Sequence, residues 1–235
     1  MLRNSSVRFG FSLVEVLAVI AVLGVLCWLT FSLLQSAQRT ATRTQSASIL
    51  RNLTSAALTY TVEHGGEFPK TGHSTGDIWA NIRAWNGTLR PYLGDDPAAF
   101  VCPDDPHYDT RIRRKTSSFT MNGYIDPGTY PQWGKPSLLS EPGSTMLFYY
   151  QARRSGYVFR DHTHASSWPG SWTAVTSDIA PDWFCDEERN ASHTRGFSYY
   201  AFADGHIESI DAQDFRRFVA TSSSPALPSV DLSKR

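Results

Sequence analysis

One carboxylate is unusual among the residues that could do chemistry, because it lies inside an otherwise apolar stretch. Residues 11–34, FSLVEVLAVIAVLGVLCWLTFSLL, contain a single charged side chain, that of Glu15. A carboxylate inside a membrane-spanning helix costs a few kcal/mol and therefore needs a partner, unless it lies at the interface where water reaches it. Cleavage after Gly10 would give Phe11 a free cationic amine, and that amine could neutralise the Glu15 carboxylate of a neighbouring copy.

A second set of residues could bind a metal ion. Residues 161–164, DHTH, place two histidines two positions apart, so a strand would present both imidazoles on one face. His193, Asp204 or His206 could then complete a tetrahedral zinc site. The alternative is that all of these are polar loop residues, because no fixed-spacing zinc motif such as H-E-x-x-H is present. We therefore leave the metal unassigned and expect no enzymatic activity.

Cys102 and Cys185 are the two cysteines that follow the apolar stretch, and the third, Cys27, lies within it. A Cys102–Cys185 disulfide would close a loop of roughly eighty residues and contribute about 4–5 kcal/mol in the chain-entropy model. Two buried thiols are the alternative, and the sequence leaves the choice open. Three cysteines are too few for a disulfide-dense scaffold or a four-cysteine zinc site.

The composition excludes two broad classes of protein. The chain has 235 residues, of which 41% are hydrophobic and 13% aromatic, which excludes wholesale disorder. Its 22 basic and 22 acidic side chains give no net charge, whereas a nucleic-acid-binding protein carries a basic surplus. Removal of residues 1–10 would take away Arg3 and Arg8, leaving 20 basic and 22 acidic side chains and a charge of −2.

The apolar stretch is long enough to cross a membrane. Its 24 residues would rise about 36 Å as a helix, against a hydrocarbon core of about 30 Å. Arg3 and Arg8 precede it without an acidic residue, so the positive-inside rule predicts a cytoplasmic N-terminus and an exported remainder. The alternative, a secretory signal peptide, has a shorter apolar run and an A-x-A cleavage site.

The residues Gly10-Phe11-Ser12-Leu13-Val14-Glu15, followed by the apolar stretch, resemble the cleavage and methylation signal of type IV prepilins and type II secretion pseudopilins. The resemblance implies that a membrane prepilin peptidase cuts after Gly10 and that Phe11 becomes N-methylated. It implies further that Glu15 brings subunits into register during filament assembly.

The helix is expected to continue beyond the apolar stretch. Residues 35–64 contain neither Gly nor Pro, and apolar residues recur there at helical spacing. Gly65-Gly66 then provides a C-terminal stop. Beyond it, strands are expected at 118–121, 145–151, 197–203 and 206–210, and short helices at 77–85 and 212–220. Asp204-Gly205 predicts a two-residue hairpin turn.

The C-terminal part resembles a branch of the same family whose signature is a histidine, nine intervening residues and Asp-Gly. Asp204-Gly205 matches the end of this H-X9-DG signature, and His193 is the candidate histidine, although ten residues separate it from Asp204. Some major pseudopilins carry calcium in a C-terminal loop. Here calcium could be held by acidic loops at 178–188 or 104–109, but no cofactor is required.

Together these features predict an α+β, pilin-like fold, in which a long N-terminal transmembrane helix packs on a small antiparallel sheet with long loops. The expected parts are a cytoplasmic leader (1–10), a membrane half (11–34) and an amphipathic half (35–64) of the helix, an exported head (65–220) and a flexible tail (221–235).

The expected function is a structural subunit of a type II secretion pseudopilus or type IV pilus-like filament. Its partners would be the prepilin peptidase, other pilin subunits, an assembly platform and membrane lipid, without nucleic acid. The expected location is the inner membrane, with the head periplasmic or on a cell-surface filament. The alternative is a cell-surface binding module anchored by a pilin-type helix.

Overall fold

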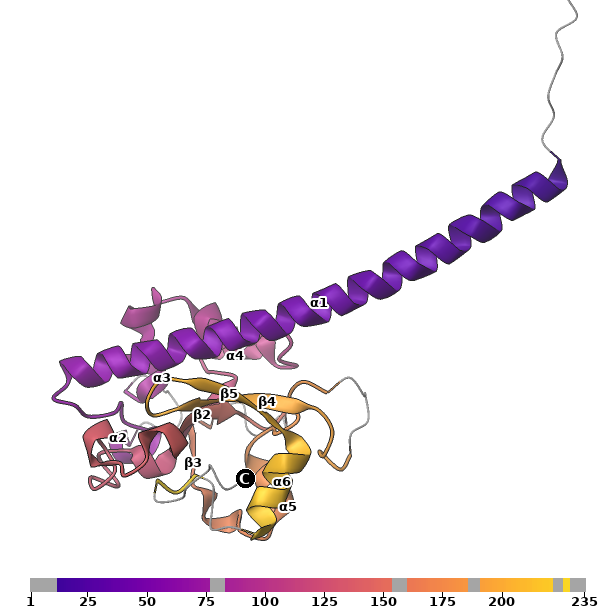
Figure 1. Cartoon of the computed structure of the whole chain (residues 1–235). Coiled ribbons are helices and arrows are strands. Elements are labelled where there is room, and N and C mark those ends of the chain that lie inside the picture. Colours follow the sequence, from indigo (N-terminus) through magenta and orange to yellow (C-terminus); the bar gives the residue numbers. More distant parts are fainter. Residues whose placement is uncertain (1–11, 77–82, 154–159, 186–190, 222–225, 229–235) are drawn as a thin grey trace, which may run out of the picture. The chain divides into compact units, whose positions relative to one another are not determined.

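The computed structural model describes residues 12–76, 83–153, 160–185, 191–221 and 226–228. The first element is helix α1, which runs without interruption from Leu13–Glu63 over 51 residues (Figure 1). Gly65 and Gly66 follow it with left-handed φ angles of 67° and 82°, and the Gly66 N–H bonds to the Thr61 carbonyl at 2.9 Å. This is the hydrogen bond of a Schellman stop, so the helix ends where the glycine pair predicts.

The chain forms two compact units, one ending at Ala41 and the other beginning at Thr42. The first contains the apolar part of α1, whose side chains from Ser12 to Ala41 are all exposed. The second contains the rest of α1 and the head. Leu50, Leu53 and Ala57 are fully buried in its core, so the amphipathic end of α1 is part of the head's own core.

The head is built on one five-stranded sheet in the order β3-β1-β2-β4-β5. Strands β1, β2, β4 and β5 form an antiparallel array, with registers such as Thr120↔Tyr149 and Tyr200↔Glu208. The sheet is mixed rather than wholly antiparallel, because β3 pairs in parallel with β1 through Met121↔His162. The strands are β1 Phe119–Asn122, β2 Met146–Tyr150, β3 His162–Thr163, β4 Phe197–Phe202 and β5 Ile207–Asp211.

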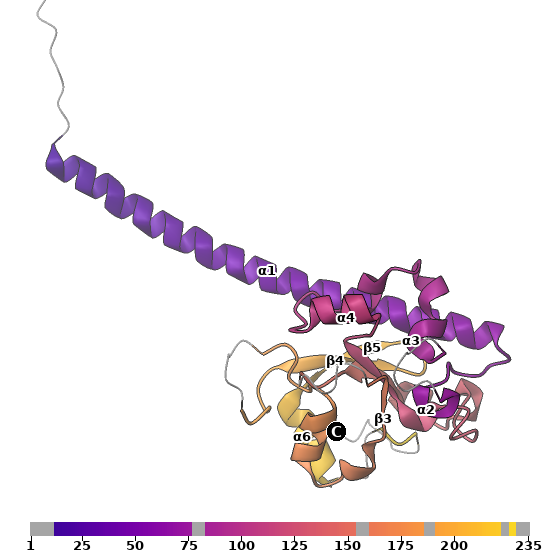
Figure 2. The ribbon, with the colours of Figure 1, turned by 180° about the vertical axis from the view of Figure 1, so that it is seen from behind.

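Both faces of the sheet are covered. Figures 1 and 2 show the end of α1 and α4 over one face, with α5 and α6 over the other. Successive side chains of β4 point to opposite faces of the sheet, as this arrangement requires. Ala201 belongs to the core cluster that contains Leu50 and Leu53, whereas Tyr200 and Phe202 belong to a second cluster. The second cluster includes Phe215 and other residues of α6, so β2 and the end of β4 are buried on both sides. The helices after α1 are α2 Gly72–Thr75, α3 Trp85–Thr88, α4 Tyr108–Arg114, α5 Trp172–Asp178 and α6 Ala212–Thr221.

Three expectations need correction. The expected helix at 77–85 is not found where it can be checked: residues 77–82 lie outside the described part, residues 83 and 84 form a bend, and helix α3 begins only at Trp85. The turn between β4 and β5 has three residues rather than two, because the Phe202 N–H bonds to the His206 carbonyl. Ala226, in the expected flexible tail, is fully buried, and its carbonyl accepts a hydrogen bond from the Asn122 side chain at 2.8 Å.

Candidate functional site

The N-terminal end of α1 is closed by a reciprocal pair of hydrogen bonds. The Ser12 N–H donates to the Glu15 carboxylate at 2.8 Å, and the Glu15 N–H donates to the Ser12 hydroxyl at 3.2 Å. Ser12 precedes the first helical residue, Leu13, so this is a capping box of the S-x-x-E type. The S-x-x-E spacing is visible in the sequence, although the sequence analysis assigns no role to Ser12.

Glu15 therefore has a local role that the sequence argument did not include. Its carboxylate satisfies one backbone donor of the first helical turn and lies at the positive end of the helix dipole. Both effects stabilise a negative charge at this end of an apolar helix. The two residues of the expected cleavage site, Gly10 and Phe11, lie outside the described residues.

The segment that follows Glu15 is apolar on every side. An 18-residue window of α1 has a mean hydropathy of 2.6 and contains no buried residue, so α1 is long and apolar enough to cross a membrane. Its exposed side chains include Leu17, Ile20, Leu23 and Trp28. A helix that is hydrophobic all round needs an apolar surrounding, either lipid or other helices.

The residues of the C-terminal signature do not form one site. His193 has a left-handed φ of 52° and its Nδ1 lies 2.9 Å from the Asp182 carboxylate. Asp204 and Gly205 lie in the β4–β5 turn, where Asp204 pairs with His206 at 2.6 Å and Gly205 has a φ of 99°. The six-residue strand β4 lies between them, so His193 and Asp204 are at opposite ends of about 17–20 Å of strand.

The proposed histidine set is likewise divided. His162 and His164 lie at β3, on one edge of the sheet, whereas His193 and His206 flank β4 on the other side of β1 and β2. Neither His193 nor the Asp204–His206 pair can therefore complete a site with residues 161–164. The structure instead brings His73 beside His162 and His164, with its Nδ1 3.3 Å from the His164 Nε2. No sequence signal marks His73, because it lies 91 positions before His164 in the chain.

Cys102 and Cys185 are free thiols, so of the two alternatives that the sequence leaves open the disulfide is not formed. Cys102 is fully buried in the main core, whereas Cys185 is half-buried in the loop before β4. Burial, followed by the nearby Asp104 charge, raises the pKa of the Cys102 thiol well above its usual range. The structure thus corresponds to the alternative of two thiols, of which only Cys102 is fully buried.

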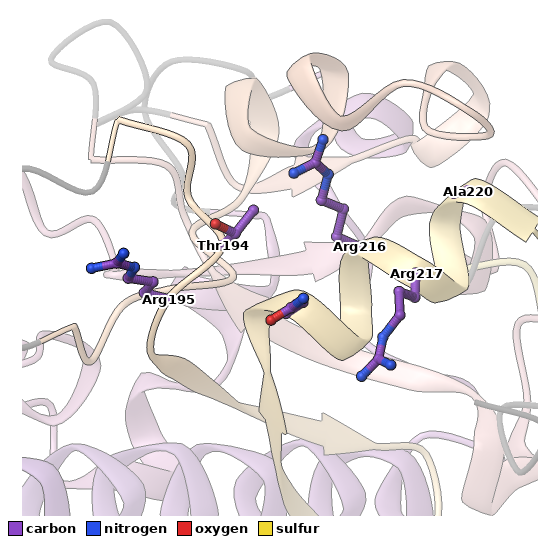
Figure 3. A pocket seen from close by; sticks show the side chains of 6 residues that line it. Thr194, Arg195, Arg216, Arg217 and Ala220 are labelled. Carbon is purple, nitrogen blue, oxygen red and sulfur yellow. The ribbon is translucent and has the colours of Figure 1, made fainter.

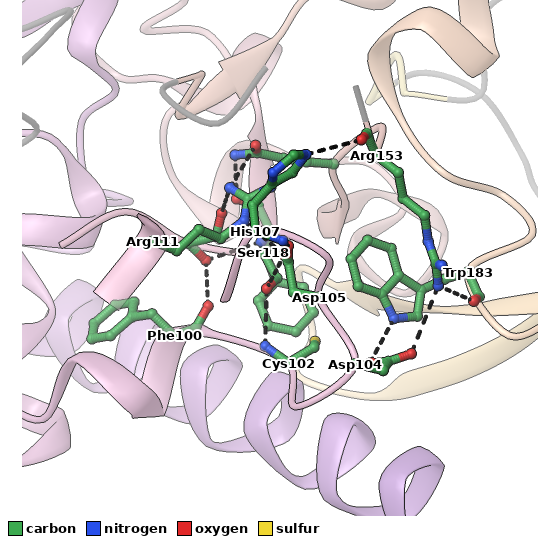
Figure 4. Close-up of polar contacts among 12 residues, drawn as sticks. Phe100, Cys102, Asp104, Asp105, His107, Arg111, Ser118, Arg153 and Trp183 are labelled. Atoms are coloured by element: carbon green, nitrogen blue, oxygen red, sulfur yellow. Dashed lines mark hydrogen bonds and ion pairs between the residues drawn. The ribbon is translucent and has the colours of Figure 1, made fainter. Parts of the chain in front are cut away.

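Acidic residues that could have held calcium are engaged with protein groups. Asp105 forms a fully buried ion pair with Arg111, with 2.6 Å between Oδ2 and Nε, and also accepts the Ser118 hydroxyl at 2.6 Å (Figure 4). Asp104 accepts the Trp183 indole N–H at 3.1 Å. In the other loop, Asp178 pairs with an arginine at 2.6 Å, while residues 186–188 lie outside the described part.

A shallow pocket of about 380 Å³ lies between α6 and the loop before β4, lined by Thr194, Arg195, Gln213, Arg216, Arg217 and Ala220. Figure 3 shows the three guanidinium groups pointing in different directions from the pocket wall. Arg217 pairs with Asp214, and Arg216 lies over the Trp172 ring at 5.9 Å. The positive charges therefore do not converge on one point, as an anion site would require.

Comparison with known proteins identifies the N-terminal segment. Residues 6–31 match the family described as the prokaryotic N-terminal methylation motif. No curated protein and no solved structure shows significant similarity to the chain. The match covers the start of α1, including the capping box and most of the apolar segment. One apolar helix and this motif fit a single-pass membrane anchor, and residues 6–31 are a prepilin-type signal.

Proposed function

We propose that the chain is a prepilin-like structural subunit that is cut after Gly10 and assembled through α1 into a type II secretion pseudopilus or type IV pilus-like filament. The observation that carries this proposal is the methylation motif at residues 6–31, placed over the start of a 51-residue helix. The chain acts by assembly rather than by catalysis.

The capping box supports a role for Glu15 both before and after cleavage. In the uncut chain, Glu15 accepts the Ser12 N–H and keeps the first turn of α1 closed. After cleavage, the Phe11 amine is a cation four positions before Glu15. A carboxylate and an ammonium group in lipid each cost several kcal/mol when alone, and pairing between neighbouring copies removes both costs.

The apolar half of α1 supplies the surface for assembly. Its exposed Val, Leu and Ile side chains lie on all sides of the helix, so it can pack against helices of several other copies at once. In the membrane, the same surface is covered by lipid until assembly. The head is carried on the same continuous helix, which makes α1 both membrane anchor and assembly element.

Arg3 and Arg8 set the orientation of the inserted chain. Both precede the apolar segment, and positive charges flanking a span remain on the cytoplasmic side. The prepilin peptidase then acts at the cytoplasmic face and the head is exported. The partners are that peptidase, other pilin-type subunits and the assembly platform of the secretion or pilus system.

Mass spectrometry of the mature N-terminus tests the processing step. We expect a chain that begins at N-methylated Phe11 when the protein is produced with a prepilin peptidase. A chain that still begins at Met1 in the presence of an active peptidase would refute processing at this site.

Two substitutions in the capping box separate assembly from helix capping. Glu15→Ala removes both the cap and the charge, and should leave cleavage intact while abolishing incorporation into filaments. Ser12→Ala is the matched control, because it removes the other half of the cap but leaves the Glu15 carboxylate in place. We expect Ser12→Ala to assemble; equal loss of assembly in the two variants would mean that capping, rather than charge pairing, is what Glu15 provides.

A further inference from the structure

Three histidines from two distant parts of the chain meet at the β3 edge of the sheet. His73 lies on the short helix α2, His162 on β3, and His164 directly after β3. Their ring centroids are 5.0–5.7 Å apart, and one ring nitrogen of each lies within 4.8 Å of those of the other two. Figures 1 and 2 both show α2 and β3 side by side.

Extended backbone explains why two of the rings share a face. His164 has φ −104° and ψ 113°, so the extended conformation of β3 continues through it. Residues two positions apart in an extended chain point to the same side, which places His162 and His164 together. His164 also packs directly on the backbone of Gly123, where an added Cβ would lie 2.7 Å from the His164 Cε1.

Two buried carboxylates hold these histidines in place. Asp161 accepts the His162 Nδ1–H at 2.8 Å and the Gly72 N–H, next to His73, at 2.6 Å. Asp126 accepts the hydroxyls of Thr71 and Ser74, on either side of His73, the latter at 2.8 Å. The α2 turn is therefore fixed to the sheet by carboxylates that lie 0–3% exposed.

The hydrogen bond from His162 to Asp161 leaves the His162 Nε2 available as a ligand. A carboxylate that accepts one imidazole N–H while the other nitrogen binds a metal is the usual outer-shell arrangement of histidine ligands. His164 is half-buried, and its Nε2 lies 3.3 Å from the Nδ1 of His73.

The His73 Nδ1 and the His164 Nε2 already have the spacing of two ligands of one metal ion. They are 3.3 Å apart, which is also within reach of a direct hydrogen bond. Two nitrogens bound to tetrahedral zinc at about 2.0–2.1 Å are separated by about 3.3–3.4 Å. All three nitrogens lie within 4.8 Å of one another, so reaching that spacing shortens each nitrogen–nitrogen distance by at most about 1.5 Å.

We propose that His73, His162 and His164 bind a zinc-class transition-metal ion, with Asp161 as the positioning residue and water at the fourth position. The cation would offset the charge of Asp161 and Asp126. It would also join α2 to β3, two segments about 90 residues apart in the chain. This site belongs to the head and does not depend on processing or assembly.

Zinc binding to the full-length protein in detergent, purified without a polyhistidine tag, tests the proposal. We expect one zinc ion per chain by titration calorimetry, and a cobalt derivative with the visible absorption of tetrahedral Co²⁺. His73→Gln, the exposed member, should fold normally and should lower zinc affinity by more than the 10–100-fold that loss of an outer-shell partner causes. His164→Gln should do the same, and Asp161→Asn should lower affinity about 10–100-fold.

His206→Gln is the matched control, because His206 is also partly exposed and paired with an aspartate but lies outside the cluster. We expect its zinc affinity to be unchanged. Absence of saturable zinc binding by the unsubstituted protein would overturn the proposal. Binding that survives in His73→Gln, or that falls equally in His206→Gln, would also overturn it.

Discussion

Loss of either member of the buried Asp105–Arg111 pair should cost the head about 3–5 kcal/mol of unfolding free energy. Both side chains are 0% exposed, and their charged atoms are 2.6 Å apart. Arg111→Met leaves the Asp105 carboxylate in the core with neutral donors, among them the Ser118 hydroxyl at 2.6 Å. Asp105→Leu leaves the Arg111 guanidinium with the neutral acceptors of Ser117 and Gln151.

The size of the effect makes it measurable by thermal unfolding. For a domain of 150–250 residues, 1 kcal/mol shifts Tm by about 2–4 °C, so each single substitution should lower Tm by about 6–20 °C. Tryptophan fluorescence of the full chain in detergent can follow the transition, because Trp85 and Trp183 are buried in the same core. Arg217→Met is the control: the Arg217–Asp214 pair is exposed, and its loss should cost less than about 1 kcal/mol.

The double variant Asp105→Leu/Arg111→Met distinguishes charge burial from lost packing. Replacement of both charges by apolar side chains leaves no unpaired charge, so the double variant should lose clearly less stability than the sum of the singles. Fully additive losses, or single variants within 1 kcal/mol of the unsubstituted protein, would refute the assignment of this pair as a coupled buried ion pair.

Three further predictions concern the head. Because burial raises the pKa of the Cys102 thiol, native alkylation at pH 8 should modify Cys185 and spare Cys102; peptide mass spectra showing the reverse would contradict the structure. Gly196→Ala and Gly205→Ala should each lower the free energy of unfolding by about 1–3 kcal/mol, because alanine would have to adopt the positive φ of these glycines. Gly196→Ala should cost more in urea unfolding, since its Cβ would lie 2.6 Å from a backbone oxygen, whereas at Gly205 it meets the end of a leucine side chain at 2.8 Å. Leu53→Ala should cost about 2–5 kcal/mol by the same measurement, because Leu53 is fully buried; a loss below 1 kcal/mol would contradict its place in the core.

The helices and strands that are determined by neighbouring residues in the chain were predictable from the sequence. The expected helix at 11–64 is confirmed as Leu13–Glu63, because its composition and the following glycine pair are local signals. The four expected strands occur within one or two residues of their positions, and the α+β, pilin-like class is confirmed. The parallel strand β3 was missed, because two residues are too few for a pattern and their pairing depends on β1.

The residues brought together by tertiary contacts were not predictable. The spacing of His162 and His164 predicts that the two share a face, whereas only residue type connects His193 and Asp204 with them. The sheet order places His193 and Asp204 beyond β1 and β2 as seen from β3, and the α2 turn supplies His73 instead. Ser12 is a different case, since its S-x-x-E spacing with Glu15 was present in the sequence and needed only the capping rule.

The position of β5 at the end of the sheet has a consequence for crowded membranes. An edge strand exposes unpaired backbone groups, and two copies held close together by membrane helices could join there strand to strand. Glu208, Ser209 and Asp211 make β5 polar over most of its length, and the two carboxylates give both copies a negative charge at this edge. Where copies pack through α1 as proposed above, this acidic edge would oppose strand-to-strand joining of their heads.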